Sequence, residues 1–290
     1  MPLWLPNQST LRMNDGGTCH VTVRPLRTGS SEKVLYFIQR LDEYAALSDA
    51  LESELSIATV TPKDTSVLRE LIANRDVSSA IKRIAEVYAQ AIIDAGRDSK
   101  RVYLAGYSFG GILAIETACE LEERGFKPDM VFLFDTFLRP AAHRIFYDVW
   151  HNKWLSRKVK EVTRGDRHEF ARRIRSLSLR LFYQSKGHHV FKGTSTTRGY
   201  ELHTILRESG GQTYRGPNRT LTSDVVLFRS GWLNTGLGVE APRRQDPNLG
   251  WANNLRGTLT LIPMHCDHTN ILRDDNLNSV AAQMNRRIAW

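Results

Sequence analysis

With 290 residues, 41% of them hydrophobic, the chain can bury one sizeable core, and we expect a single globular domain with an insertion. Its apolar runs are too short for a membrane span, its three scattered cysteines argue against a disulfide framework, and its N-terminus does not resemble an export signal. We therefore expect a cytoplasmic protein without membrane contact. A formal charge of +9 and a pI of about 9.6 favour an acidic partner, a nucleic acid or an anionic surface.

The N-terminal half of the chain alternates predicted strands with predicted helices. Residues 1–18 mix Pro, Asn and Gly with isolated apolar residues, which predicts a leader or linker before a domain at 19–290. The alternating HVTVRPL and the continuous apolar run in SEKVLYFI predict two strands, of which the second is central. Helical spacing then predicts helices over 42–55 and 77–95, with a short strand at 57–60 between them.

The second half continues this alternation after a basic insertion. Apolar runs predict strands at 130–134, 224–228 and 258–263, and a C-terminal helix over 277–288. Short links between alternating elements are typical of a mostly parallel sheet with helices on both faces. Ligands of such sheets gather at the carboxyl ends of the strands. The fold class is therefore α/β.

The insertion, at about 143–214, differs from the rest of the chain in composition. Between residues 153 and 186 it has 11 Lys and Arg against three Asp and Glu, with apolar residues at roughly helical spacing. We expect a pair of amphipathic helices that forms a lid over the edge of the sheet where the strands have their carboxyl ends and where an active site would lie. Its basic face is either simply solvated or a docking surface for an acidic protein. His188 and His189 are expected at the surface of this lid rather than as ligands.

The segment from Arg101 to Leu121 reads as a strand, a tight turn and a helix, with Ser108 in the turn. Gly106 and Gly110 lie two residues before and after the serine, where a strained strand-to-helix turn leaves no room for side chains. The N–H of Phe109 would then face a developing oxyanion. The segment predicts a nucleophile elbow, the alternative being a glycine turn with an inert serine.

A serine nucleophile needs a histidine base, and the base needs an acid that fixes its tautomer. In the hydrolase chain order the base comes last, and His265 and His268 both follow the last predicted strand. Asp135 ends the strand after the nucleophile helix, and Asp246 is its main rival as the acid. HCDH at 265–268 could instead bind a metal, but consecutive loop residues rarely all face one ion, so we expect no metal site.

Several of these pieces, taken together, resemble the type I thioesterase domains that end non-ribosomal peptide and polyketide assembly lines, and their stand-alone relatives. The matching pieces are GYSFGG at 106–111, LFDTF at 133–137, the GW pair at 250–251 and CDHTNIL at 266–272. They span roughly residues 20–290 in the order that the family has. The resemblance implies an α/β-hydrolase fold with a helical lid.

The resemblance also implies roles for the candidate residues. Asp135 would be the acid, and His268, which directly follows an aspartate as in the family, would be the base. The substrate would arrive as a thioester on the phosphopantetheine arm of an acidic carrier protein, so no bound cofactor is expected. The basic insertion lies where the family has its lid and would suit an acidic partner electrostatically.

One departure from the family concerns the oxyanion hole. The family has a glycine-containing loop after its central strand, whereas Phe37 here runs into IQRLDEY without a glycine. By position we choose Arg40 as the second oxyanion donor beside Phe109. Cys266 also stands where the family has glycine.

We therefore expect a serine thioesterase that releases an acyl, peptidyl or polyketide chain from a carrier protein by hydrolysis or cyclisation. Ser108 would attack, His268 would act as base and then acid, and Asp135 would orient it. The alternatives are an ordinary carboxylesterase or lipase and a non-catalytic carrier-protein binder that uses the basic lid. A nucleic-acid binder would use the same basic residues, but the predicted triad disfavours it.

Overall fold

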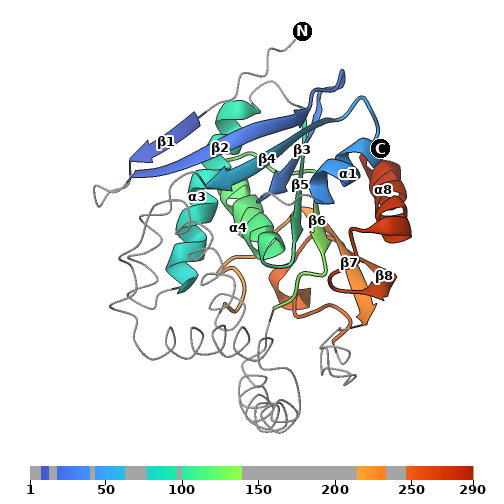
Figure 1. Cartoon of the computed structure of the whole chain (residues 1–290). Coiled ribbons are helices and arrows are strands. Elements are labelled where there is room, and N and C mark those ends of the chain that lie inside the picture. Colours follow the sequence, from blue (N-terminus) through green and yellow to red (C-terminus); the bar gives the residue numbers. More distant parts are fainter. Residues whose placement is uncertain are drawn as a thin grey trace, which may run out of the picture.

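The strands of the described residues form one sheet of eight members that crosses the molecule (Figure 1). Their order is β1-β2-β4-β3-β5-β6-β7-β8; the pairs β1–β2 and β2–β4 are antiparallel, and every pair from β4 to β8 is parallel. The sheet is thus mostly parallel, as predicted. The strands are β1 (Gln8–Arg12), β2 (Thr18–Arg27), β3 (Lys33–Ile38), β4 (Ser56–Pro62), β5 (Arg101–Tyr107), β6 (Met130–Phe134), β7 (Asp224–Trp232) and β8 (Leu259–Asp267).

The computed structural model does not describe every residue of the chain. The predicted lid at 143–214 lies outside the described residues except for Tyr214, so the lid and its boundaries stay a prediction. The described residues are 8–12, 18–39, 43–62, 77–96, 100–138, 214–232 and 246–289.

Helices cover both faces of the sheet (Figure 1). On one face α3 and α4 pack against a core that includes Trp251, and on the other α1 and α8 pack against a second core that includes Phe37. Among the described helices, none combines the length and the apolar character that a bilayer crossing requires. The helices are α1 (Glu43–Ala50), α3 (Val77–Ala95), α4 (Phe109–Glu123) and α8 (Asp274–Ile288), with a 3-10 turn, η2 (Ala252–Asn254), before β8.

The register of the central strands aligns their carboxyl ends. Strand β3 is buried from Val34 to Ile38 because neighbours on both sides and helices on both faces cover it, which explains its unbroken apolar sequence. On the other side of β5, Tyr107 pairs with Phe134 of β6. The next residues, Ser108 and Asp135, therefore leave the sheet at the same level.

Three expectations about the elements are wrong in detail. Part of the stretch predicted as a leader is strand β1, which pairs with β2 at the edge of the sheet. Strand β8 runs to Asp267 instead of ending near residue 263, so His265 lies in the strand and not in the following loop. The first helix ends at Ala50, because residues 51–55 form a turn before β4.

Candidate active site

Ser108 occupies a strained turn between β5 and α4. Its φ of 53° and ψ of −117° lie in a region that few non-glycine residues adopt, and such strain is common at functional sites. Its N–H donates to the carbonyl of Phe134 on the neighbouring strand, at 2.9 Å. A Cβ at Gly106 would overlap the Gly110 carbonyl, and one at Gly110 would lie 3.0 Å from the carbonyl of Ile38. The glycine spacing is therefore a steric requirement of this turn, as the sequence predicts.

The structure brings the three predicted triad side chains together. The Nε2 atom of His268 lies 3.1 Å from Oγ of Ser108, and its Nδ1 atom lies 2.7 Å from Oδ2 of Asp135. With the Nδ1 proton donated to the carboxylate, Nε2 is left as the acceptor for the serine proton. Asp135 is buried, whereas about a quarter of the His268 side-chain surface is exposed. The arrangement can serve nucleophilic catalysis by the serine.

Asp135 is held by β7 as well as by the histidine. The N–H of Ser230 donates to Oδ1 at 3.1 Å, and the Ser230 hydroxyl donates to Oδ2 at 2.7 Å. Donors on both oxygens fix the plane of the carboxylate and thereby the direction in which it meets Nδ1. Ser230 was not predicted from the sequence, because its contact with Asp135 depends on the parallel pairing of β6 with β7.

The carboxylate of Asp246, the rival acid, accepts hydrogen bonds from its own loop. Its two carboxylate oxygens accept the N–H groups of Asn248 and Gly250, at 2.8 and 2.7 Å. The following residue, Trp251, is fully buried, and its indole N–H donates to the carbonyl of Thr136 just after Asp135. The loop of Asp246 therefore packs beside the active-site edge without supplying the acid that contacts His268.

Three neighbouring strands are each followed directly by a non-glycine residue with positive φ. Gln39 follows β3 with φ 71°, Ser108 follows β5 with φ 53°, and Asp135 follows β6 with φ 45°. Backbone strain is thus concentrated at one edge of the sheet. The Gln39 side chain is buried beside the first turn of α4, close to Gly110. No sequence signal pointed to Gln39, because positive φ at a non-glycine residue leaves no mark in composition.

Of the two predicted oxyanion donors, the structure describes Phe109 but not Arg40. Phe109 is the first residue of α4, so its N–H belongs to the first helical turn directly after Ser108. Arg40 lies outside the described residues, and its role stays a prediction. The residue before it, Gln39, directly follows β3 and donates its N–H to the carbonyl of Val60 at 2.9 Å.

The side chains of the HCDH stretch at 265–268 do not all face the same side of β8. His265 is exposed, while Met264 and Cys266 are buried in the core beside α8. Burial raises the pKa of the Cys266 thiol to about 11, so it is a neutral thiol near pH 7 and not a competing nucleophile. Within the described ranges, no group of three His, Cys, Asp or Glu side chains gathers as metal ligands would.

Asp267 shapes the turn that presents His268. Its carboxylate accepts the N–H groups of Thr269 and Asn270, at 2.9 and 3.0 Å, and the Thr269 hydroxyl at 2.8 Å. An aspartate that hydrogen-bonds the backbone two and three residues on closes a tight turn. This explains physically why the residue before His268 is an aspartate.

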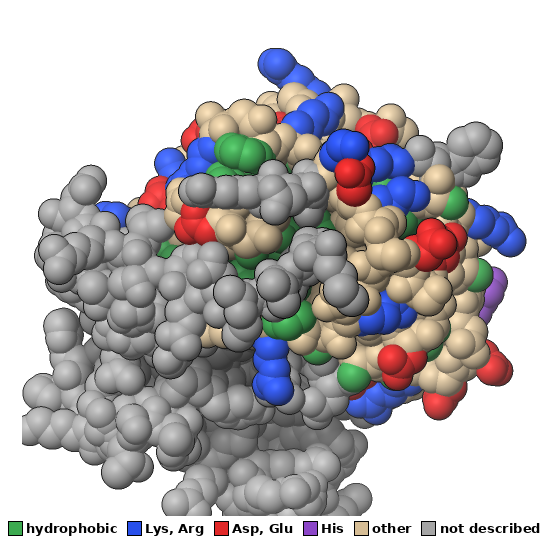
Figure 2. Space-filling model, turned by 90° about the horizontal axis from the view of Figure 1, so that it is seen from above, with side chains coloured by type: hydrophobic (Ala, Val, Ile, Leu, Met, Phe, Trp, Pro, Cys, Tyr) green, Lys and Arg blue, Asp and Glu red, His purple; other side chains and the backbone are tan. Residues whose placement is uncertain are grey.

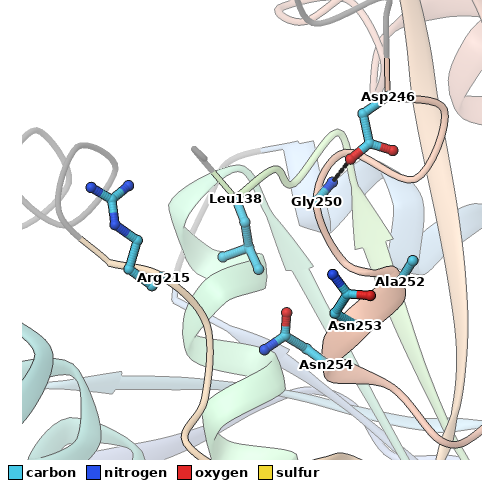
Figure 3. A pocket seen from close by; sticks show the side chains of 7 residues that line it. All are labelled: Leu138, Arg215, Asp246, Gly250, Ala252, Asn253 and Asn254. Carbon is cyan, nitrogen blue, oxygen red and sulfur yellow. Dashed lines mark hydrogen bonds between the residues drawn. The ribbon is translucent and has the colours of Figure 1, made fainter. Parts of the chain in front are cut away.

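A cavity of about 370 Å³ opens beside the Asp246 loop (Figure 3). The side chains that it brings together are mostly polar, and the Gly250 N–H bond to Asp246 closes one wall. Leu138, on the segment that continues from Asp135, supplies an apolar surface. The lining residues are Leu138, Arg215, Asp246, Gly250, Ala252, Asn253 and Asn254.

The positive charge of the chain is unevenly distributed. Lys and Arg nearly balance Asp and Glu among the described residues, whereas the whole chain has 40 of the former against 31 of the latter. On the face seen in Figure 2, basic and acidic side chains are interspersed over the described surface. The excess of positive charge therefore lies outside the described ranges.

Comparison with known families adds to this geometry. The family model described as thioesterase domain matches residues 41–180, just under half of the chain. The expected resemblance to thioesterase domains is thereby confirmed. The matched stretch includes Ser108 and Asp135 and ends before His268. No curated protein matches the sequence.

Solved structures of thioesterase domains share the fold. The Vlm2 thioesterase domain with genetically encoded 2,3-diaminopropionic acid, bound with a dodecadepsipeptide, is 16% identical with a TM-score of 0.55, and the alignment covers 91% of this chain and 96% of that one. The thioesterase domain SrfTE, described for the cyclization of the lipopeptide antibiotic surfactin, is 15% identical with a TM-score of 0.54, covering 92% and 94%.

A third match is part of a larger assembly. The four-domain non-ribosomal peptide synthetase AB3403, bound to AMP and glycine, is 16% identical with a TM-score of 0.55. The alignment covers 91% of this chain but only 20% of the synthetase. At these identities the likeness concerns the fold, which is that of the α/β hydrolases. The family match and the fold together support a hydrolase of the thioesterase type.

Proposed function

We propose that the chain is a serine thioesterase that releases an acyl or peptidyl chain from the phosphopantetheine thioester of a carrier protein. The observation that carries this proposal is the contact chain from Ser108 through His268 to Asp135, with distances of 3.1 and 2.7 Å. The thioesterase family match supports the choice of a thioester over other acyl substrates.

The chemistry that these residues would perform has two stages. As Oγ of Ser108 attacks the thioester carbonyl carbon, its proton passes to Nε2 of His268, and Asp135 stabilises the imidazolium. The C–S bond then breaks, His268 returns the proton to the leaving thiolate, and an acyl-serine remains. Water or a nucleophile within the chain attacks this ester in the same way. The proposed oxyanion donors are the N–H of Phe109 and, on the other side, Arg40.

The proposed partner is an acidic carrier protein, and the proposed docking surface is the basic insertion at 143–214. The excess positive charge of the chain lies outside the described core, which agrees with this proposal. Charge complementarity would mainly speed the encounter, so binding should weaken as the salt concentration rises.

A panel of acyl thioesters tests the proposal. The protein is incubated with acyl chains loaded on a carrier protein, with the matching pantetheine thioesters and with oxygen esters of the same acids, and the products are weighed. Turnover of the carrier-bound thioesters, blocked by a fluorophosphonate, supports a thioesterase. Preference for oxygen esters would instead indicate a carboxylesterase, and carrier binding without labelling or turnover would indicate a non-catalytic binder.

A further inference from the structure

The residue before the nucleophile makes contacts that the triad itself does not account for. Tyr107 stacks on the imidazole of His268, with ring centroids 4.8 Å apart and an angle of 25° between the planes. Its hydroxyl donates to the backbone carbonyl of the same histidine at 2.7 Å. The Tyr107 side chain thus contacts both the ring and the backbone of His268.

Tyr107 is itself anchored from α1. Its backbone N–H donates to the hydroxyl of Tyr44 at 3.0 Å, and the Tyr44 ring stacks on Phe37 of β3 with centroids 4.2 Å apart. Tyr44 and Phe37 are fully buried, so this support is rigid. Burial also raises the pKa of Tyr107 well above its ordinary value, which keeps its hydroxyl protonated and able to donate.

The base loop needs such a support because of where it comes from. His268 follows β8, and two strands, β6 and β7, separate β8 from the strand that carries Ser108. The turn at Asp267 fixes the shape of the loop through hydrogen bonds to Thr269 and Asn270 of the loop itself. Tyr107 is the last residue of β5, one position before Ser108, and it joins the loop directly to that strand.

We propose that Tyr107 is a positioning residue for the base: it ties the backbone and ring of His268 to the nucleophile elbow and so sets the distance between Nε2 and Oγ of Ser108. The proposal rests on the triad function proposed above. Because Tyr107 and Ser108 are consecutive, any movement of the elbow would carry the base with it. The position is the variable one in the G-x-S-x-G motif, so the motif alone assigns it no role.

The test compares two tyrosines of the same strand. In Tyr107→Phe the stacking ring remains but the hydrogen bond to His268 is lost. Tyr103→Phe is the matched control, because the Tyr103 hydroxyl likewise lies near a backbone carbonyl, that of Ile288 at 3.4 Å, but away from the site. Rates of fluorophosphonate labelling, kcat and KM on a pantetheine thioester, and Tm are measured for both.

We expect Tyr107→Phe to label roughly tenfold more slowly and to lose a similar factor in kcat with KM unchanged, because the base is misplaced while the acyl site is intact. Tyr103→Phe should label at the parental rate. In a His268→Ala background, whose residual rate is measured on an activated thioester, Tyr107→Phe should cost nothing further, since the residue acts through the base.

The outcomes separate this inference from the proposed function. If the parent protein is not labelled at Ser108, the proposed triad function fails, and the positioning role fails with it. If the parent is labelled and Tyr107→Phe matches it in labelling rate and kcat, the positioning role alone is overturned. An equal loss for Tyr107→Phe in the parent and in the His268→Ala background would also overturn it, because the effect would then not pass through the histidine.

Discussion

Nε2 of His268 and Oγ of Ser108 lie 3.1 Å apart although 160 residues separate them in the sequence. The contact requires the loop after β8 to reach back over the ends of β7 and β6, and Asp135 at the end of β6 meets the same imidazole on its way. One edge of the sheet therefore collects the serine, the histidine and the aspartate of the proposed triad from the ends of three different strands.

This geometry predicts the effect of removing the nucleophile or the base. Ser108→Ala should abolish fluorophosphonate labelling and acyl release, and His268→Ala should lower both by a factor on the order of 10³ or more. Labelling, turnover and Tm are measured together, because intact folding with lost labelling assigns the loss to chemistry. Parental turnover in folded Ser108→Ala would contradict the proposed function.

The acid can be identified by a matched pair of aspartate substitutions. Asp135→Asn removes the charge that stabilises the imidazolium and favours the wrong tautomer, so kcat should fall by a factor on the order of 10³. Asp246→Asn replaces a carboxylate oxygen that accepts a backbone N–H of its own loop, at a cost of about 1 kcal/mol in stability with little change in kcat. Equal losses in kcat would reopen the choice between the two.

The sequence predicts the central fold well because its signals there are local. The apolar runs of β3 and β6, the periodic stripe of α3 and the glycines around Ser108 each follow from short-range sterics or burial. Strand β1 was missed because a strand that pairs on one side at the edge of a sheet needs no apolar run.

The residues of the candidate site also differ in whether local sequence signals or tertiary contacts reveal them. Ser108 follows from its own motif, whereas Asp135 could not be separated from Asp246, nor His268 from His265, without the family resemblance. The supporting side chains, Ser230 and Tyr107, reach the site only through strand pairing and loop packing. Such contacts are set by tertiary structure and leave no periodic pattern in the chain.

A third glycine of the elbow, Gly111, should be as sensitive to substitution as the two motif glycines. A Cβ at Gly111 would overlap the hydroxyl of Thr136, which is buried where α4 meets the segment after Asp135. Gly111→Ala should therefore lower the free energy of unfolding by roughly 3 kcal/mol, or push Thr136 and the adjoining acid out of place. Urea unfolding and labelling rate are the measurements.

Gly125→Ala is the control for Gly111. Gly125 has φ 80° with nothing within 4 Å of an added Cβ. Gly125→Ala should therefore lower the free energy of unfolding only through backbone strain, by about 1 kcal/mol. Its labelling rate should equal that of the parent, since it lies at the far end of α4. A smaller loss at Gly111 than at Gly125 would contradict the steric argument.

The stability of the core should depend on pH through Glu116 of α4. This carboxyl is buried and accepts a hydrogen bond from the Tyr214 hydroxyl. Burial raises its pKa above the ordinary 4.5; the Tyr214 bond and the charges of Arg219 and Lys82 oppose the shift, and Glu120 adds to it. Because the folded pKa is raised, the contribution to stability is fully present below pH 4.5 and is lost as the pH rises through the folded pKa.

Substituting the carboxyl by an amide isolates this effect. Glu116→Gln keeps an acceptor for Tyr214 but cannot ionise, so its unfolding free energy relative to the parent should increase between pH 4.5 and 8. The gain should be about 1.4 kcal/mol for each unit by which folding raises the pKa. Tyr214→Phe should do the opposite, because it removes a donor to the ionised carboxyl and so destabilises more at pH 8 than at pH 4.5. Urea unfolding at four pH values measures both variants, and differences from the parent that stay constant with pH would show that Glu116 does not titrate in this range.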